Sequence, residues 1–233
     1  MTADPWTKEY ISETVAVYQS YERSTRLAPG LTAAVAGILA LWEMTADTAH
    51  EKTLHNIADV YASAVRSDGQ FTEQMHLNLA TGEGYPEGEH PHSSTFFMNT
   101  FGGQHVLIEL SELLRHRQLA DALTRHADFY LKQESAGTGV LGFLAHAAHS
   151  SGRPEYREAI RKIIDTIKVS DWSDPSAAPD YNTIALVEIG GDSLLDTPRH
   201  AILPGMTRRN KVACHKLGDT MHLVPYGLAA LED

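Results

Sequence analysis

The sequence predicts an all-α protein in which helical hairpins follow one another and pack side by side in an arc. Two observations support this fold class. Apolar residues recur at helical spacing over most of the chain, and an internal repeat appears without gaps. We find no sheet-forming stretch of any length; residues 182–189 have a strand-like composition but also fit a short buried helix. We expect one domain over residues 1–233.

The first three helices have recognisable boundaries. Asp4 is a suitable N-cap, Pro5 suits the first helical position, and Pro29-Gly30 ends the first helix. The apolar positions of that helix are Trp6, Tyr10, Val17 and Tyr21. Residues 31–45 and 50–66 then form a predicted hairpin, which residues 67–71 close.

The hairpin recurs with an offset of 69 residues. The residues that repeat are Leu41, Glu43, Leu54, Ala58, Asp59 and Tyr61, which match Leu110, Glu112, Leu123, Ala127, Asp128 and Tyr130. A weaker third copy follows at a further 37 residues, with Ile160, Ile164 and Asp165. A single hairpin cannot bury its apolar face alone, so the copies are expected to stack. We expect inner helices at about 31–45 and 102–116, with residues 67–101 as an inserted loop.

Composition and charge narrow the possible partners. The 233 residues are 42% hydrophobic and 21% charged, with a net charge of -11, which disfavours nucleic acid and anionic membranes as partners. The single cysteine, Cys214, excludes an internal disulfide and a four-cysteine zinc site. The most apolar stretch, residues 31–42, is too short to span a bilayer. No secretory signal precedes it, so we expect a cytoplasmic protein.

The segment before the second inner helix is the first candidate site. Residues 83–105 immediately precede or begin the second expected inner helix and are rich in His, Ser, Asn and aromatic residues, and binding residues concentrate on loops. We expect His105 to carry a proton in the reaction, with His92 or Tyr181 as the second catalytic group. The expected substrate-binding residues are Tyr85, Asn99, Gln104, Asn182 and His215. The alternative interpretation is a helix capped by Asn99 or Thr100 beside solvated histidines.

A second candidate lies near the C-terminal end. His215, Asp219 and His222 recur at one helical face, where they could hold a metal ion, form an acid–base pair, or simply face water. We expect no metal and no other cofactor. Five histidines are interpreted as surface or core residues without a chemical role: His50, His116, His126, His146 and His149.

Residues 101–131, "FGGQHVLIELSELLRHRQLADALTRHADFYL", resemble a segment of the (α/α) toroid of carbohydrate-active enzymes. They share its Gly-Gly helix start, Leu-rich inner helix, short turn and outer helix. The nearest resemblance is to β-L-arabinofuranosidase-type glycoside hydrolases and their unsaturated-uronyl hydrolase relatives. In that family Met-Asn-Glu follows the glycines, whereas Gln104-His105-Val106 follows here. Toroid-type polysaccharide lyases, which use Tyr and His in place of paired carboxylates, fit this difference better.

The resemblance implies a carbohydrate-active enzyme that acts on an acidic, uronate-containing glycan by lyase or hydrolase chemistry. Two alternatives stay open: a noncatalytic helical repeat that binds a glycan or a protein, and a degenerate toroid paralogue. Terpene cyclases are excluded because no Asp-Asp-x-x-Asp motif occurs, and lanthionine cyclases lack support because there is no second cysteine. We also expect a homo-oligomer, because apolar residues mark both ends of the arc, among them Trp6, Tyr10 and Tyr21, then Leu223, Tyr226 and Leu228.

Overall fold

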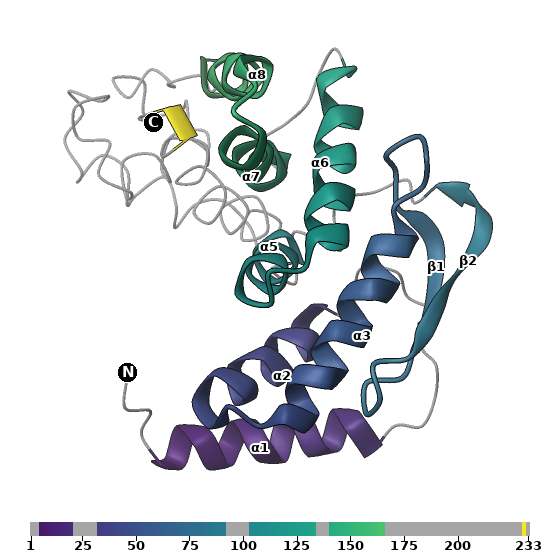
Figure 1. The fold of residues 1–233 in the computed structure, drawn as a ribbon, viewed down its shortest axis with the longest axis vertical. Helices are drawn as coiled ribbons and strands as arrows, with labels where there is room; N and C mark the ends of the chain where they lie inside the picture. The colour runs from purple at the N-terminus through teal and green to yellow at the C-terminus, as the bar shows by residue number, and fades with distance from the viewer. Residues whose placement is uncertain (1–4, 21–31, 92–102, 134–139, 166–229, 232–233) are drawn as a thin grey trace, which may run out of the picture. The chain divides into compact units, whose positions relative to one another are not determined.

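A computed structural model describes residues 5–20, 32–91, 103–133, 140–165 and 230–231 (Figure 1). Seven α-helices dominate these ranges, which confirms the predicted all-α class. The chain forms two compact units, Met1–Phe129 and Tyr130–Asp233. The expectation of one domain over 1–233 stays a prediction. In the described ranges, no helix combines the length and the apolar character that a membrane span requires.

The first unit begins with three helices that lie side by side: α1 (Pro5–Ser20), α2 (Thr32–Thr45) and α3 (Thr48–Ala64) (Figure 1). Pro5 opens α1, as predicted. Both α2 and α3 lie within a few residues of the predicted hairpin helices. The core between them contains the fully buried side chains of Val35, Ile38, Leu54, Ile57 and Tyr61. Their helical spacing is the reason why the sequence predicted this hairpin.

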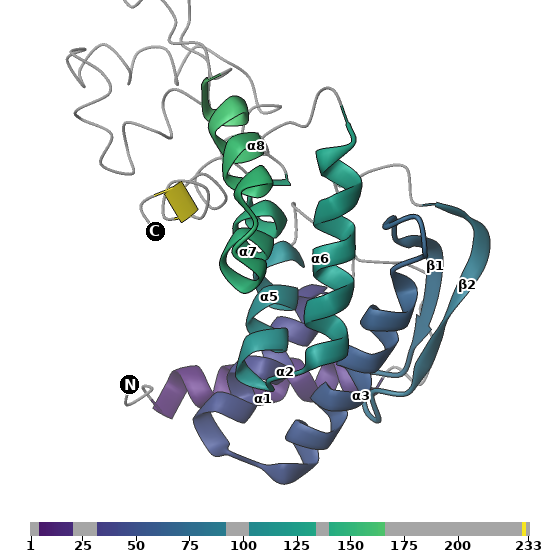
Figure 2. The same ribbon diagram turned by 45° about the horizontal axis from the view of Figure 1, so that its top comes forward.

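The second hairpin consists of α5 (Gly103–Leu113) and α6 (Arg117–Leu131), and α5 packs against α2 and α3 (Figure 2). The first inner helix was predicted correctly, while the second is a little shorter than the predicted 102–116. The buried face of α6 follows helical periodicity, with Leu119, Ala122, Leu123 and Ala127 all fully buried.

The second unit contains the third hairpin, α7 (Leu141–Ser151) and α8 (Pro154–Asp165), which pack together. Every residue of α7 from Leu141 to Ala148 is buried. Helix α8 buries one face, on which Tyr156, Ile160 and Ile163 follow each other at i, i+4 and i+7.

All three hairpins turn on a residue with a left-handed backbone. The φ angles are 53° at Ala46, 51° at Arg115 and 68° at Gly152. These positions are spaced by the same 69 and 37 residues as the sequence repeat. In each case the following helix begins two residues later, at Thr48, Arg117 and Pro154. The repeat is therefore a structural unit and not a chance match of amphipathic helices.

The residue between the left-handed position and the second helix caps that helix in the first two hairpins. In the first, a side-chain oxygen of Asp47 accepts a hydrogen bond from the backbone N–H of Ala49 at 2.8 Å. In the second, Nδ1 of His116 accepts from the N–H of Leu119 at 3.2 Å. Both contacts satisfy an N–H that has no partner inside the helix. His116 thus has a structural role that its sequence context did not indicate.

The expectation that no stretch forms a sheet was wrong. Strands β1 (Thr72–Leu77) and β2 (Gly84–Pro91) pair as an antiparallel hairpin inside the predicted loop 67–101. Their sequence is rich in Glu, Gly and Pro, which are depleted in strands, so propensity gave no signal. Packing decides instead, because Met75 and Leu77 are fully buried and the hairpin lies along α3, on the side away from α2 (Figures 1 and 2).

The tip of the β-hairpin is fastened to α3. The side-chain amide of Asn56 donates to the carbonyl of Thr81 at 2.8 Å, and the hydroxyl of Thr53 donates to the carbonyl of Ala80 at 3.3 Å. Gly82 has a φ of 75°, and a Cβ there would lie 2.2 Å from the carbonyl oxygen of Thr53. Because a two-stranded hairpin is marginally stable alone, these contacts hold it in place.

The left-handed turns predict opposite changes in the free energy of unfolding for two substitutions. Gly152 has no atom within 4 Å of a built Cβ, so Gly152→Ala tests the backbone alone. We expect the free energy of unfolding to fall by about 1 kcal/mol in Gly152→Ala and to rise by up to about 1 kcal/mol in Ala46→Gly. Urea denaturation measures both. If the free energy of unfolding changes in the same direction in both variants, the left-handed backbone does not determine the effect of substitution at these positions.

Candidate functional site

Most of the predicted site residues lie outside the described ranges. His92, Asn99, Tyr181, Asn182 and His215 fall there, as do Asp219 and His222 of the possible metal face. Their convergence on one cavity stays a prediction. The described site residues are Tyr85 on β2, and Gln104 and His105 in the first turn of α5.

The first turn of α5 contains a buried and a half-buried polar side chain. Gln104 is 2% exposed and belongs to the packed side of the helix, whereas His105 is half-buried. The first N–H groups of a helix have no partner within it and attract negative charge. No acidic residue lies in the first turn of α5, so no side chain of that turn opposes an anion. Of the two residues, His105 is therefore the better placed to meet a ligand.

Tyr85 lies on β2 with 58% of its surface exposed. Its ring stacks on the imidazole of His76, with ring centres 4.6 Å apart and ring planes 22° apart. The two residues are direct partners in the register of the hairpin, so strand pairing brings them together. Nε2 of His76 lies 2.5 Å from a carboxylate oxygen of Glu87, to which it donates.

Four side chains form one face of the β-hairpin, which we call the hairpin stripe: Gln74, His76, Tyr85 and Glu87. Gln74 pairs with Glu87 in the register, and His76 pairs with Tyr85. Because side chains alternate along a strand, the stripe lies on the opposite face from Met75 and Leu77, which are buried. The core-facing side holds the hairpin on α3, and the stripe is left to contact solvent or a ligand.

His76 contributes to the stripe from a buried position. Its side chain is 10% exposed, and no described residue forms a hydrogen bond with its Nδ1. The hydrogen bond to Glu87 therefore orients the imidazole. His76 was absent from the sequence-based site. The signal that would have found it is the alternation Gln74-x-His76 facing Tyr85-x-Glu87, but this requires the strand register.

A second histidine cluster links α3 to the start of α6. Nε2 of His116 lies 3.2 Å from a carboxylate oxygen of Asp59, and the centre of the His116 ring lies 5.7 Å from that of His55. Nδ1 of His116 already accepts from Leu119. Each ring nitrogen of His116 therefore lies next to a group of the protein itself. These contacts link α3 to the start of α6, and the interpretation of His116 as a residue without a chemical role stays a prediction.

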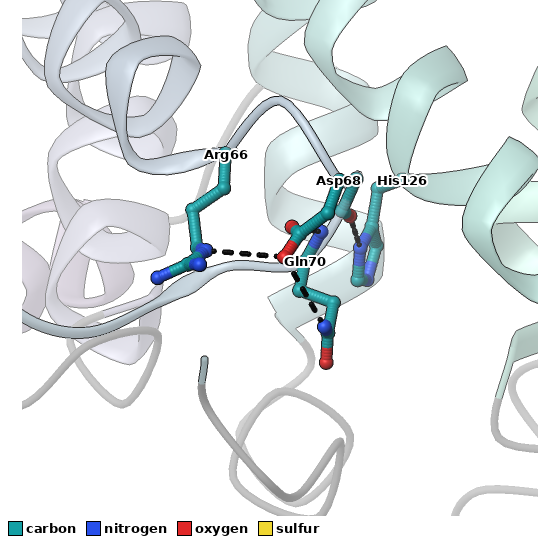
Figure 3. Close-up of polar contacts among 5 residues, drawn as sticks. Arg66, Asp68, Gln70 and His126 are labelled. Carbon is teal, nitrogen blue, oxygen red and sulfur yellow. Dashed lines mark hydrogen bonds and ion pairs between the residues drawn. The ribbon is translucent and has the colours of Figure 1, made fainter. Parts of the chain in front are cut away.

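A third polar cluster closes the connection between α3 and β1 (Figure 3). Asp68 accepts from the backbone N–H of Gln70 at 3.0 Å and pairs with Nε of Arg66 at 3.3 Å. The backbone hydrogen bond from Gln70 lowers the pKa of Asp68. Next to it, Nδ1 of His126 donates to the carbonyl of Gly69 at 2.7 Å. Burial lowers the pKa of His126 to about 4, so the ring is neutral near pH 7.

The electrostatic character around the stripe is acidic. From residue 67 to residue 114 the sequence contains no Lys and no Arg. The carboxylates of Glu73, Glu83 and Glu87 are exposed in this range. Within the part of the chain that the structure describes, no three His, Cys, Asp or Glu residues are grouped so that they could hold a metal ion.

Comparison with known proteins identifies a family. Residues 4–153 match the family described as PcRGLX-like protein C-terminal alpha/alpha toroid domain. No curated protein and no solved structure matches the chain. The match covers α1 to α7 and includes both the β-hairpin and the start of α5. It confirms the α/α toroid, while the nearer resemblance to arabinofuranosidases stays a prediction.

The buried His126 gives a prediction on pH. Its pKa is about 4 in the folded protein and near 6.5 when unfolded, so the unfolded state binds more protons between these values. The contribution of the neutral His126 to the free energy of unfolding is fully present above about pH 6.5. It is lost as the pH is lowered toward 4. We expect this residue to account for a loss of about 2 kcal/mol between pH 7 and pH 5.

The control is His126→Asn, whose amide N–H can replace Nδ1 as the donor to Gly69 but does not titrate. Urea denaturation at both pH values should show a smaller pH dependence in this variant. Equal losses in the two proteins would mean that His126 does not take up a proton on unfolding.

Proposed function

The chain belongs to the family of PcRGLX-like protein C-terminal α/α toroid domains, and from this premise we propose that it acts on a uronate-containing glycan, as a lyase or a hydrolase. The observation that carries the proposal is the match over residues 4–153 to a family of rhamnogalacturonan lyase-like proteins. This family gives the chain a carbohydrate-active role; the acidic substrate and the reaction type are our proposal.

Lyase chemistry makes definite demands on the site. A base removes the proton from the carbon next to the uronate carboxyl, the electron pair forms a double bond to the neighbouring carbon, and the glycosidic oxygen leaves from that carbon. A second group must stabilise the charge that develops on the carboxylate. His105 is our candidate for the base, since an imidazole exchanges protons near neutral pH. The backbone N–H groups at the start of α5 are our candidate for the second role.

The distribution of charge limits how the carboxylate can be held. Because residues 67–114 contain no Lys or Arg, positive charge from this segment can come only from histidines and backbone N–H groups. His90, His92 and His105 supply such histidines in the sequence. The proposal thus predicts that this segment contributes hydrogen-bond donors, and no bidentate arginine, to recognition of the uronate.

Hydrolysis is the less favoured of the two reactions. Glycoside hydrolases generally need two carboxylates, one on each side of the bond to be broken. The residues at the start of α5, Gln104, His105 and Val106, provide none. An imidazole at this position suits proton abstraction better than it suits glycosidic hydrolysis.

The test is His105→Ala, assayed for binding and for cleavage of uronate oligosaccharides by the absorbance of the unsaturated product. We expect cleavage to fall by roughly 10²–10⁴-fold, as when a general base is removed. The free energy of unfolding should change by no more than about 0.5–1 kcal/mol, because His105 is only half-buried. The matched control is His149→Ala, which removes an exposed histidine from α7 and should leave cleavage unchanged.

Three outcomes would contradict the proposal. Unfolding of His105→Ala would make the residue part of the core. Unchanged cleavage would move the site elsewhere. Binding of acidic oligosaccharides by the wild type without any unsaturated or hydrolysed product would favour the noncatalytic binding protein.

Self-association is the second part of the proposal. Trp6, Tyr10 and Val17 share one face of α1 and are 78%, 72% and 55% exposed. Apolar side chains that extend along one helix face in this way are typical of a contact surface. We expect a homo-oligomer in light scattering at micromolar concentration, and weaker association in the double variant Trp6→Ser, Tyr10→Ser. A monomeric wild type would contradict this.

A further inference from the structure

We propose that the hairpin stripe binds a neutral sugar residue of a glycan, at a place distinct from the start of α5. That the ligand is a glycan rests on the proposed function. That the bound residue is neutral rests on the charges of the hairpin itself. The stripe is built on β1 and β2, whereas His105 belongs to α5, so the two sites can be tested by separate substitutions.

Tyr85 provides the contact surface. His76 covers one face of the Tyr85 ring at a centre distance of 4.6 Å, and the residue is still 58% exposed, so we infer that the other face of the ring is open to a ligand. The face of an aromatic ring carries partial negative charge. The C–H groups on one side of a pyranose ring carry partial positive charge and form a flat apolar surface. A sugar placed on the open face of Tyr85 therefore gains both apolar burial and electrostatic attraction.

The ring is held in position before any ligand arrives. His76 is the cross-strand partner of Tyr85, is itself largely buried, and is oriented by its hydrogen bond to Glu87. Met75 and Leu77 anchor the same strand in the core. A ring that is already ordered loses little conformational entropy on binding, which favours affinity from a small contact.

Hydrogen-bonding groups lie beside the ring at a suitable spacing. Gln74 and Glu87 form the next cross-strand pair on the same face, two residues along each strand, or about 7 Å away. That distance is comparable to the width of one sugar ring. The side chain of Glu87 is 45% exposed, and its carboxylate can accept hydrogen bonds from sugar hydroxyls while one oxygen contacts His76.

Charge selects the neutral sugar. Glu73, Glu83 and Glu87 are exposed on this hairpin, and no Lys or Arg occurs between residues 67 and 114. A uronate on Tyr85 would place its carboxylate beside that of Glu87 with no Lys or Arg of the hairpin to offset the repulsion. A neutral residue donates hydroxyl hydrogens to the same carboxylate. In a glycan that contains both kinds of residue, the stripe would take the neutral one.

The experiment is a calorimetric titration with two probes, a neutral galactan oligosaccharide and an oligogalacturonate. We expect the wild type to bind the neutral probe. Tyr85→Ala should weaken this binding by about tenfold or more, whereas Tyr85→Phe, which keeps the ring, should stay within about threefold. Tyr18→Ala, which removes a partly exposed tyrosine from α1, is the matched control and should bind like the wild type.

Glu87→Gln separates charge from hydrogen bonding. The amide oxygen of glutamine can still accept from His76, so the stripe keeps its shape while it loses the negative charge. We expect several-fold weaker binding of the neutral probe, and stronger residual binding of the oligogalacturonate than in the wild type. Circular dichroism verifies that each variant is folded.

The inference is overturned if the neutral probe does not bind the wild type, or if it binds Tyr85→Ala as well as it binds the wild type. It is also overturned if oligogalacturonate binds at Tyr85 more tightly than the neutral probe. Failure of the proposed function would give different observations from failure of this inference. Loss of neutral binding in Tyr85→Ala, without any cleavage by the wild type, would support the stripe and contradict the enzyme. Cleavage that depends on His105, in a wild type that does not bind the neutral probe, would support the enzyme and contradict the stripe.

Discussion

The contact between Gly69 and α6 is the constraint on which the arrangement of the first unit depends. Gly69 has a φ of 87°, and a Cβ there would lie 2.5 Å from the carbonyl oxygen of Arg125. Only glycine allows the turn after α3 to approach the backbone of α6 so closely. His126 then donates to the carbonyl of Gly69, and its ring meets Phe71 edge-on at 4.7 Å between centres. The start of β1 is thereby fixed against the second hairpin.

The β-hairpin is held at both of its ends as a result. One end is attached to α6 through Gly69, and the tip is attached to α3 through Thr53 and Asn56. This explains how a segment of low strand propensity keeps a defined register and a stacked Tyr85 on its surface. The helical hairpins repeat one turn geometry, while the insertion between them carries the exposed aromatic and acidic side chains. In repeat proteins, such insertions commonly carry the binding function.

The sequence predicted the scaffold well because the scaffold is periodic. Leu54 and Ala58 recur as Leu123 and Ala127, and all four side chains are fully buried. The β-hairpin escaped prediction because Met75 and Leu77 are its main buried apolar contribution, too few to give an alternating pattern. Its stability comes from contacts with α3 and α6, which the local sequence does not contain.

The candidate site rests in part on residues proposed from the sequence. Tyr85 and His105 were proposed from residue type and from their position before or at the start of an inner helix, and their roles stay predictions. His76 was missed because its partners Tyr85 and Glu87 become neighbours only through strand register. Of the other histidines, His126 and His146 are buried and His149 is exposed, while the expectation that they have no chemical role stays a prediction. Nothing in the pattern distinguished His116, because its role as a helix cap depends on the turn at Arg115.

The central claim is that this toroid domain recognises a glycan through its inserted hairpin and the start of α5. An NMR titration of the ¹⁵N-labelled protein with an oligosaccharide that contains both uronate and neutral residues tests it most directly. We expect chemical-shift changes at the backbone amides of Gln74, Tyr85 and Glu87 and at those of Gln104 and His105, with little change in α8. Shift changes confined to α1 or to the hairpin of α7 and α8, or no changes at all, would contradict it.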